Sequence, residues 1–159
     1  MEAALRSAYE LATGKTLDNV EFTAVRGIEG VKEATVDLDG TPVTVAVASG
    51  LGNARTLLER VAEEKKAGKT SYHFIEIMAC RAGCVGGGGQ PLPNTMAQRE
   101  ARIAGLYKED AGLPMRKSHE NPEVMALYKD VLGKPGGEKS HHLLHTEYRV
   151  RSPYEVTRT

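Results

Sequence analysis

The chain has 159 residues, a length that suits one domain. Its 21 lysine and arginine side chains balance 21 aspartate and glutamate side chains, which argues against nucleic acid or an acidic membrane surface as an electrostatic partner. Two cysteines do not make a disulfide framework, no secretory signal pattern precedes the first helix, and no apolar run approaches the length of a membrane span. The composition therefore indicates an intracellular globular protein.

The N-terminal part of the chain predicts a helix and then a strand. Residues 1–13 contain good helix formers with apolar side chains at helical spacing, and Gly14 follows as a typical stop signal. Residues 20–26 alternate between apolar and polar side chains, and this period predicts a strand.

A β-hairpin is the clearest local prediction. The segments 31–38 and 43–47 are rich in β-branched side chains, and an Asp-Gly pair at 39–40 lies between them. Asp-Gly between two such segments is a strong hairpin signal. Residues 53–66 then predict an amphipathic helix, and residues 71–77 predict a further strand.

The C-terminal part is predicted to be helical. A capping-box pattern opens a helix over 95–107. An Asn-Pro pair opens a second helix over 121–132, and Ser140 is expected to cap a last short helix that ends at His145.

These elements predict an α/β fold in two parts. Residues 1–92 are expected to form one lobe, in which helices flank a mixed sheet made of the hairpin plus a parallel strand. Residues 93–159 are expected to form a helical C-terminal wrap that ends in a polar tail.

The most informative segment follows the strand at 71–77. It holds the two cysteines of the chain, Cys80 and Cys84, and four consecutive glycines at 86–89. Thiolates presented by backbone with few side chains suit an iron–sulfur cluster, because glycine lets peptide N–H groups approach sulfur closely. A pair of buried thiols or a small disulfide loop is the alternative, and the glycines and the strand-end position favour metal.

The segment from Met78 to Pro91 closely resembles the third cysteine signature of the catalytic domain of FeFe (iron-only) hydrogenases. Ala82 stands where many members of that family have glycine. Other stretches of the chain also resemble the family, the last two in its small-subunit region: 1–6, 50–55, 116–122 and 140–146.

The resemblance implies reversible reduction of protons to dihydrogen at an H-cluster, which is a 4Fe-4S cubane joined to a diiron subcluster. It implies that Cys80 is a cubane ligand, and that Cys84 is a cubane ligand and the bridge to the diiron unit. It also implies that the soft thioether of Met78 lies against the diiron site. Backbone donors or close approach around the cluster are expected from four residues: Gly86, Gly87, Gly88 and Gly89.

The chain supplies only half of the ligands that such a cluster needs. A cubane held by protein takes four thiolates, and the family's other two cysteines belong to earlier signatures that do not occur here. We therefore expect the C-terminal part of a longer catalytic subunit, inactive alone. Its expected partners are the upstream part of that subunit and a ferredoxin-type or other redox protein. Because the small-subunit-like region is fused, a cytoplasmic enzyme is expected.

Two glycine patterns are weak nucleotide signals. Gly50 and Gly52 follow a strand and open a helix, as in a dinucleotide-binding turn, but Arg55 occupies the position of the third glycine. A tight strand-to-helix turn is favoured there, although the helix N-terminus could attract an anion. The glycines at 83–88 have P-loop spacing, but Gly-Gln at 89–90 replaces the residues that bind phosphate and magnesium.

Two other functions remain as alternatives. One is a structural zinc-binding domain, because His141 and His145 would share a helix face while His119 and the cysteines offer further ligands. Most histidines pack and hydrogen-bond instead, which disfavours zinc. The other is a non-catalytic iron–sulfur protein used in assembly or sensing. Such relatives tend to diverge at the Gly-Gln-Pro end of the signature, which this chain keeps through Pro91.

Overall fold

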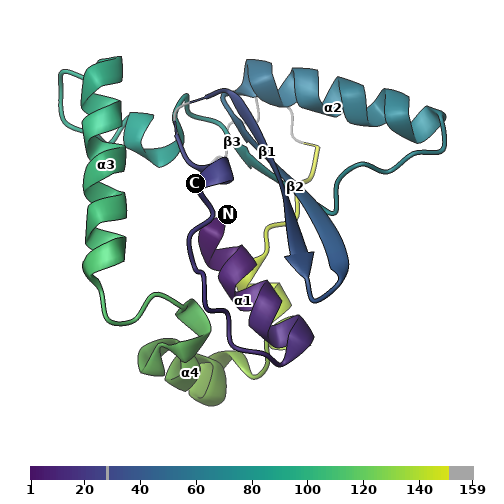
Figure 1. Ribbon diagram of the computed structural model, residues 1–159, viewed down its shortest axis with the longest axis vertical. Helices are drawn as coiled ribbons and strands as arrows, with labels where there is room; N and C mark the ends of the chain where they lie inside the picture. Colours follow the sequence, from purple (N-terminus) through teal and green to yellow (C-terminus); the bar gives the residue numbers. More distant parts are fainter. Residues whose placement is uncertain (28, 151–159) are drawn as a thin grey trace, which may run out of the picture. The chain divides into compact units, whose positions relative to one another are not determined.

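The computed structural model describes residues 1–27 and 29–150 of the chain (Figure 1). The chain divides into two compact units, Met1–Lys117 and Ser118–Thr159, named unit 1 and unit 2. Among the described residues, unit 1 contains a sheet and three α-helices, and unit 2 contains short helices only. None of the described helices combines the length and the apolar character needed to cross a membrane.

A three-stranded mixed sheet lies at the centre of unit 1. β1 (Val31–Leu38) pairs antiparallel with β2 (Thr41–Ser49), and β3 (Phe74–Met78) pairs parallel with β2. Asp39 and Gly40 connect β1 to β2 with φ angles of 54° and 89°, the left-handed values that a two-residue hairpin turn favours. The predicted α/β class, with a hairpin plus a parallel strand, is confirmed.

Two helices pack on opposite faces of this sheet (Figure 1). α1 (Glu2–Thr13) ends at Gly14 as predicted, and α2 (Leu51–Lys66) begins slightly before its predicted start at 53. Side chains of β2 alternate between the two faces, so both helices find an apolar surface on the same strand. The α1 side contains Leu5, Val25, Val45 and Val47, and the α2 side contains Ala46, Ala48, Ala54 and Leu57.

The strand predicted at 20–26 is wrong. This segment contains one 3-10 turn and otherwise irregular backbone, and side chains of α1 satisfy its backbone polar groups. Arg6 Nε donates a hydrogen bond to the Val20 carbonyl oxygen (2.9 Å), and the Phe22 N–H donates to Glu2 Oε1 (3.1 Å). Because these backbone groups already have partners, the segment does not need a sheet ladder.

Helix α3 (Met96–Gly112) completes unit 1. The predicted capping box is confirmed, because the Thr95 N–H donates to Gln98 Oε1 (3.0 Å) and the Gln98 N–H donates to Thr95 Oγ1 (3.4 Å). The helix continues past its predicted end at 107 and stops just ahead of Pro114, a residue that cannot continue a helix.

Unit 2 is helical within its described residues. α4 (Pro122–Leu127) continues into a π-helical turn, η4 (Tyr128–Leu132), and together they match the predicted helix. Asn121 caps α4, since its side-chain oxygen accepts a hydrogen bond from the Glu123 N–H (2.9 Å). A 3-10 turn, η3 (Ser118–Glu120), precedes α4 in unit 2. Two further 3-10 turns of the described residues lie in unit 1: η1 (Thr23–Val25) and η2 (Gly83–Gly86).

The last helix begins earlier than the sequence predicts. α5 (Glu138–Leu144) follows Gly137, so the predicted cap at Ser140 is wrong. Ser140 is buried inside the helix, and its hydroxyl bonds to the carbonyl oxygens of Lys134 and Gly137 (2.8 and 2.9 Å). It therefore bonds backward to the preceding loop, whereas a cap bonds forward to helix N–H groups. The predicted polar tail lies outside the described residues beyond 150.

Charged hydrogen bonds fasten α3 to α1 within unit 1. The Asp110 carboxylate accepts two hydrogen bonds from the Arg6 guanidinium (both 2.9 Å) and one from Arg116 Nε (3.2 Å). These two guanidinium groups hold the pKa of the Asp110 carboxyl well below its usual range. Arg6 is only 3% exposed, so its charge depends for compensation on Asp110 and on Glu2, whose carboxylate lies 3.6 Å from the guanidinium.

We predict that Asp110→Asn lowers the free energy of unfolding at pH 7 by about 2 kcal/mol, because it leaves the buried Arg6 cation without a full countercharge. A carboxyl with a depressed folded-state pKa stabilises the fold above its unfolded pKa, and this stabilisation is lost as the pH falls toward the folded value. The difference between wild type and variant should therefore shrink below about pH 4 in urea unfolding.

Glu109→Gln is the matched control for this substitution, because Glu109 is an exposed neighbour on the same helix. Its effect on the free energy of unfolding should stay within about 0.5 kcal/mol. An equal loss at pH 3 and at pH 7 for Asp110→Asn would show that Asp110 does not stabilise through its charge.

Candidate metal centre

The two thiols lie on one loop at the end of the sheet. This cysteine loop, residues 79–91, begins where β3 ends at Met78. Cys80 and Cys84 are both exposed and both free of disulfide bonds. The structure therefore has neither the buried thiols nor the disulfide of the alternative interpretation.

Each cysteine begins a tight backbone turn. The Gly83 N–H donates to the Cys80 carbonyl oxygen (3.0 Å), and the Gly87 N–H donates to the Cys84 carbonyl oxygen (3.1 Å). The turns repeat at the spacing of the cysteines, so both sulfurs are presented by the same kind of local backbone. Such an arrangement suits thiolate ligands that must share one metal cluster.

The first turn needs left-handed backbone at two successive residues. Ala82 has φ 65° and Gly83 has φ 71°, a region that L side chains adopt rarely and glycine adopts freely. A Cβ on Gly83 would also lie 2.7 Å from the Met78 sulfur. Gly83 is thus a structural requirement, and Ala82 holds a left-handed conformation that glycine would adopt more readily.

Two of the four consecutive glycines lie close to other atoms of the described structure, and at Gly86 the absence of a side chain is sterically required. A Cβ on Gly86 would lie 2.1 Å from the Arg81 carbonyl oxygen. A Cβ on Gly87 would lie 3.2 Å from the Cys84 carbonyl oxygen and 3.8 Å from the Cys80 sulfur. At Gly88 and Gly89 a Cβ would meet no described atom within 4 Å.

Side chains from α3 and the segment before it hold the carbonyl groups of the cysteine loop. The Arg102 guanidinium donates to the Val85 and Pro91 carbonyl oxygens (3.1 and 2.8 Å), and Asn94 Nδ2 donates to the Gly86 carbonyl oxygen (3.2 Å). Arg102 also donates to Asn94 Oδ1 (2.9 Å), so the two side chains support each other. These contacts were missed from the sequence, which gives no signal for a pairing across the fold.

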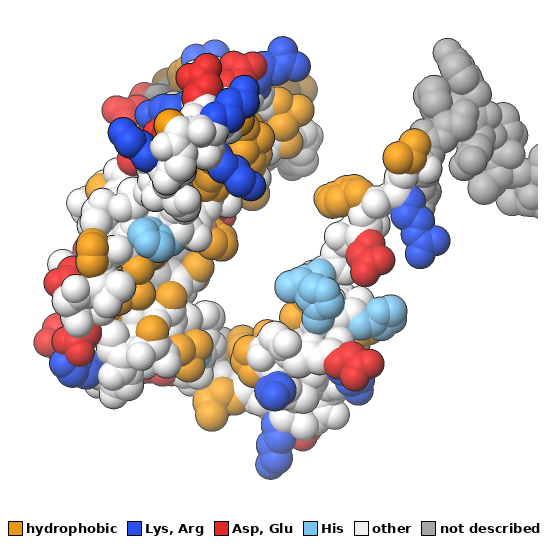
Figure 2. All heavy atoms as spheres, turned by 90° about the vertical axis from the view of Figure 1, so that its right-hand side faces the viewer, with side chains coloured by type: hydrophobic (Ala, Val, Ile, Leu, Met, Phe, Trp, Pro, Cys, Tyr) orange, Lys and Arg blue, Asp and Glu red, His pale blue; other side chains and the backbone are white. Residues whose placement is uncertain are grey.

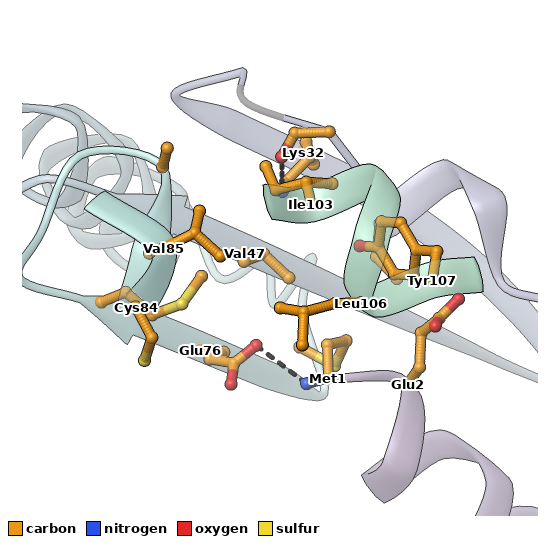
Figure 3. A pocket seen from close by; sticks show the side chains of 15 residues that line it. Met1, Glu2, Lys32, Val47, Glu76, Cys84, Val85, Ile103, Leu106 and Tyr107 are labelled. Carbon is orange, nitrogen blue, oxygen red and sulfur yellow. Dashed lines mark hydrogen bonds and ion pairs between the residues drawn. The ribbon is translucent and has the colours of Figure 1, made fainter. Parts of the chain in front are cut away.

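Cys84 and Met78, but not Cys80, line a pocket of about 300 Å³ (Figure 3). Figure 3 shows Cys84 and Val85 on one side of this pocket and the side chains of α3 on the other. Most of the lining is apolar, and its α3 members are Ile103, Leu106 and Tyr107.

Two charged side chains from the sheet also line this pocket. Burial lowers the pKa of the Lys32 ammonium, and Lys32 Nζ donates to the Gly27 carbonyl oxygen (2.9 Å). Glu76, on β3, is the second of these side chains. The pocket therefore combines an apolar wall, the sulfur-bearing side chains of Met1, Met78 and Cys84, and a few charged groups. Such a lining is typical of a site that binds and orients a cofactor.

The donor set near the loop is incomplete by itself. Thiolates are soft ligands that suit iron–sulfur clusters and zinc, and each of these normally takes four protein ligands. Among the described residues, no third Cys, His, Asp or Glu joins Cys80 and Cys84 in a ligand cluster. The two thiols fit half of a cluster site.

Histidine side chains gather on the helical part of unit 2 (Figure 2). The rings of His141 and His145 lie 4.3 Å apart, edge to face, as expected for residues four apart on a helix. Within residues 118–150, no third ligand side chain completes a metal site with this pair. The described part of unit 2 thus offers a ring contact rather than a zinc site.

We predict that Gly86→Ala lowers the free energy of unfolding by about 2 kcal/mol, because the new methyl group overlaps a backbone oxygen that cannot move freely. Gly88→Ala is the matched control, since the added methyl meets no described atom, and it should change stability by less than about 0.5 kcal/mol. Urea unfolding measures both. Equal effects of the two substitutions would contradict the close packing of Gly86 against Arg81.

Two family models match the chain in sequence. Residues 1–88 match the iron only hydrogenase large subunit, C-terminal domain, and residues 96–151 match the iron hydrogenase small subunit. The first match alone covers more than half of the chain.

Individual relatives agree with these matches. NADP-reducing hydrogenase subunit HndD of Solidesulfovibrio fructosivorans is 54% identical over 152 residues, which are 95% of this chain and 25% of that protein. Protein NAR1 of Arabidopsis thaliana is 33% identical over 152 residues, 92% of this chain and 31% of that protein. The chain thus spans roughly a quarter to a third of the length of these relatives.

Solved structures show the same likeness. A variant of FeFe-hydrogenase HydA1 from Chlamydomonas reinhardtii matches with a TM-score of 0.68 and 41% sequence identity, over 92% of this chain and 43% of that one. Together with the family models, this likeness covers both the cysteine loop and the helices that follow it. The chain belongs to the iron-only hydrogenase family, in which it corresponds to the C-terminal domain of the large subunit followed by a small-subunit region.

Proposed function

We propose that this chain is the C-terminal part of the catalytic subunit of an FeFe hydrogenase, and that Cys80 and Cys84 supply two of the four thiolates of its cubane. The observation that carries the proposal is the cysteine loop, with two exposed free thiols that each begin a tight turn beside glycine backbone. When bound, the H-cluster supplies the chemistry that interconverts protons and dihydrogen. The part of this chain is to bind the cluster, orient it and exclude water.

The two cysteines are proposed to have different roles. Cys84 lines the pocket together with Met78, whereas Cys80 does not, which supports Cys84 as the bridge to the diiron unit and Cys80 as a ligand of the cubane alone. The Met78 thioether would form a soft, polarizable wall of the diiron site. Gly83 allows this placement, because any side chain there would meet the Met78 sulfur.

Glycine backbone and α3 are proposed to shape the rest of the cluster environment. Gly87 lies beside the Cys80 sulfur. Gly86, Gly88 and Gly89 belong to the same stretch of backbone without side chains. Arg102 and Asn94 engage loop carbonyl oxygens, and the Gly87 N–H closes the turn at Cys84. Donors to a cluster would therefore come from other N–H groups of the glycine stretch, such as those of Gly88 and Gly89. N–H donors near the sulfurs help to set the potential of an iron–sulfur cluster.

The remaining cluster ligands and the redox contacts are assigned to other parts of the protein. We assign the two missing thiolates to the upstream part of the same subunit, and electron exchange to a ferredoxin-type or other redox partner. Residues 1–92 would carry the cluster loop and residues 93–159 the small-subunit-like region. The large-subunit and small-subunit matches lie in one chain, which supports a cytoplasmic enzyme.

A second candidate function is iron–sulfur cluster assembly. It is favoured by the 33% identity to Protein NAR1 of Arabidopsis thaliana, which covers the same part of the chain. The higher identity of 54% to a hydrogenase subunit favours the enzyme instead. The retained Gln90-Pro91 end of the signature agrees, and in the structure Gln90 Nε2 donates to the Cys84 carbonyl oxygen (3.3 Å).

We predict that Cys84→Ala in the complete catalytic subunit abolishes hydrogen evolution, because it removes both a cubane ligand and the proposed bridge. Glu59→Gln, on the exposed face of α2, is the control and should keep wild-type turnover. Hydrogen evolution from a chemical reductant and iron content are measured on the same samples.

Turnover near the wild-type level in Cys84→Ala would refute the bridging role. A complete wild-type protein that carries its iron but evolves no hydrogen would favour the assembly function over the enzyme.

A further inference from the structure

A hollow of about 410 Å³ lies where β2 leads into α2, on unit 1. It is separate from the pocket that holds Cys84 and Met78, and it has no acidic side chain in its lining. The lining residues are Gly30, Ser49, Gly50, Gly52, Asn53 and Arg81.

The first turn of α2 contributes Gly52 and Asn53 to the lining of this hollow. Intrahelical bonding begins with the Ala54 N–H, which donates to the Gly50 carbonyl oxygen (3.0 Å), so the N–H groups of 51–53 have no acceptor within the helix. No side chain caps this end, because Asn53 Nδ2 donates to the Ser49 carbonyl oxygen instead (2.7 Å). A helix of 16 residues also places the positive end of its dipole here.

Ser49 provides an independent indication of a ligand. It is 1% exposed, and its Oγ has no hydrogen-bond partner among the described residues. Its N–H is already engaged with the Gly30 carbonyl oxygen (2.8 Å), so only the hydroxyl is unsatisfied. A buried polar group without a partner is rare in native proteins, and a ligand oxygen in the hollow would complete it.

Arg81 adds a cation to the same lining. It is exposed, and within residues 1–27 and 29–150 its guanidinium forms no ion pair. A guanidinium presents several N–H donors in a planar fork, which matches the oxygens of phosphate or a carboxylate. Backbone N–H groups, a buried hydroxyl and an unpaired guanidinium thus converge without any competing carboxylate.

We propose that this hollow binds a small tetrahedral oxyanion of the phosphate class. All the donors that line it are suited to oxygen, and its charge is positive. A nucleotide fits less well, because none of the lining residues offers an aromatic or aliphatic side chain against which a base could stack. Free phosphate and a nucleotide share the phosphate group that these donors would bind. Of the two ligands, free phosphate suits this lining.

The site is connected to the cysteine loop by covalent and hydrogen bonds. Arg81 directly follows Cys80 in the chain, and the Gly50 N–H donates to the Met78 carbonyl oxygen (2.8 Å). An anion held by Arg81 and the start of α2 would therefore fix the first turn of the loop. Binding itself does not depend on the proposed hydrogenase function.

The test is titration of sodium phosphate into the complete subunit by calorimetry, in a buffer free of multivalent anions, with adenosine monophosphate as a second titrant. Wild type should bind one phosphate per chain. Arg81→Gln and Ser49→Ala should each weaken binding about tenfold or more, as expected when a charged or buried hydrogen bond is lost. Arg55→Gln removes an exposed arginine of α2 that does not line the hollow, and it should bind like wild type.

Arg81→Lys is a further variant that keeps the test decisive if Ser49→Ala fails to fold. Lysine retains the positive charge of Arg81 but lacks the planar guanidinium with its several N–H donors. It should bind more weakly than wild type and more tightly than Arg81→Gln. No phosphate binding by wild type, or equal binding by Arg81→Gln and Arg55→Gln, would overturn the proposal, and so would binding of the nucleotide without binding of free phosphate. Iron content measured on the same samples separates this result from the fate of the cluster.

Discussion

The steric fit of glycine backbone inside the cysteine loop is the constraint on which the rest of the site depends. A side chain at Gly86 would overlap the Arg81 carbonyl oxygen, and one at Gly83 would overlap the Met78 sulfur. The close turns that these residues permit set the positions of both thiols. Because a loop of this kind has little apolar surface of its own, it needs support from a neighbouring element.

That support comes from α3, whose position is in turn fixed by charge. Arg102 and Asn94 bind the carbonyl oxygens of the loop, and Asp110 near the other end of the helix binds the buried guanidinium of Arg6. The same helix supplies an apolar wall of the pocket that Cys84 lines. The cysteine loop, the pocket wall and the ion pair are thus all connected through α3.

Local signals allowed much of the fold to be predicted, and long-range contacts account for the errors. The Asp-Gly turn at 39–40 and the capping box at Thr95 are set by neighbouring residues, so their elements are where the sequence indicates. The strand at 20–26 failed because α1 side chains satisfy its backbone. The cysteine signature identified the loop, but the pairing of Arg102 with Val85 spans 17 residues and leaves no sequence pattern. The different surroundings of the two cysteines likewise emerge only from packing.

The central claim is that this chain supplies half of a cluster site. It is tested most directly by the iron and acid-labile sulfide content of the 159-residue chain alone after anaerobic reconstitution. Two thiolates should leave little or no stably bound cluster, since a cubane takes four. A stable cubane on this chain, whether one per chain or one shared by two chains, would contradict the claim and give the chain a cluster-binding role of its own.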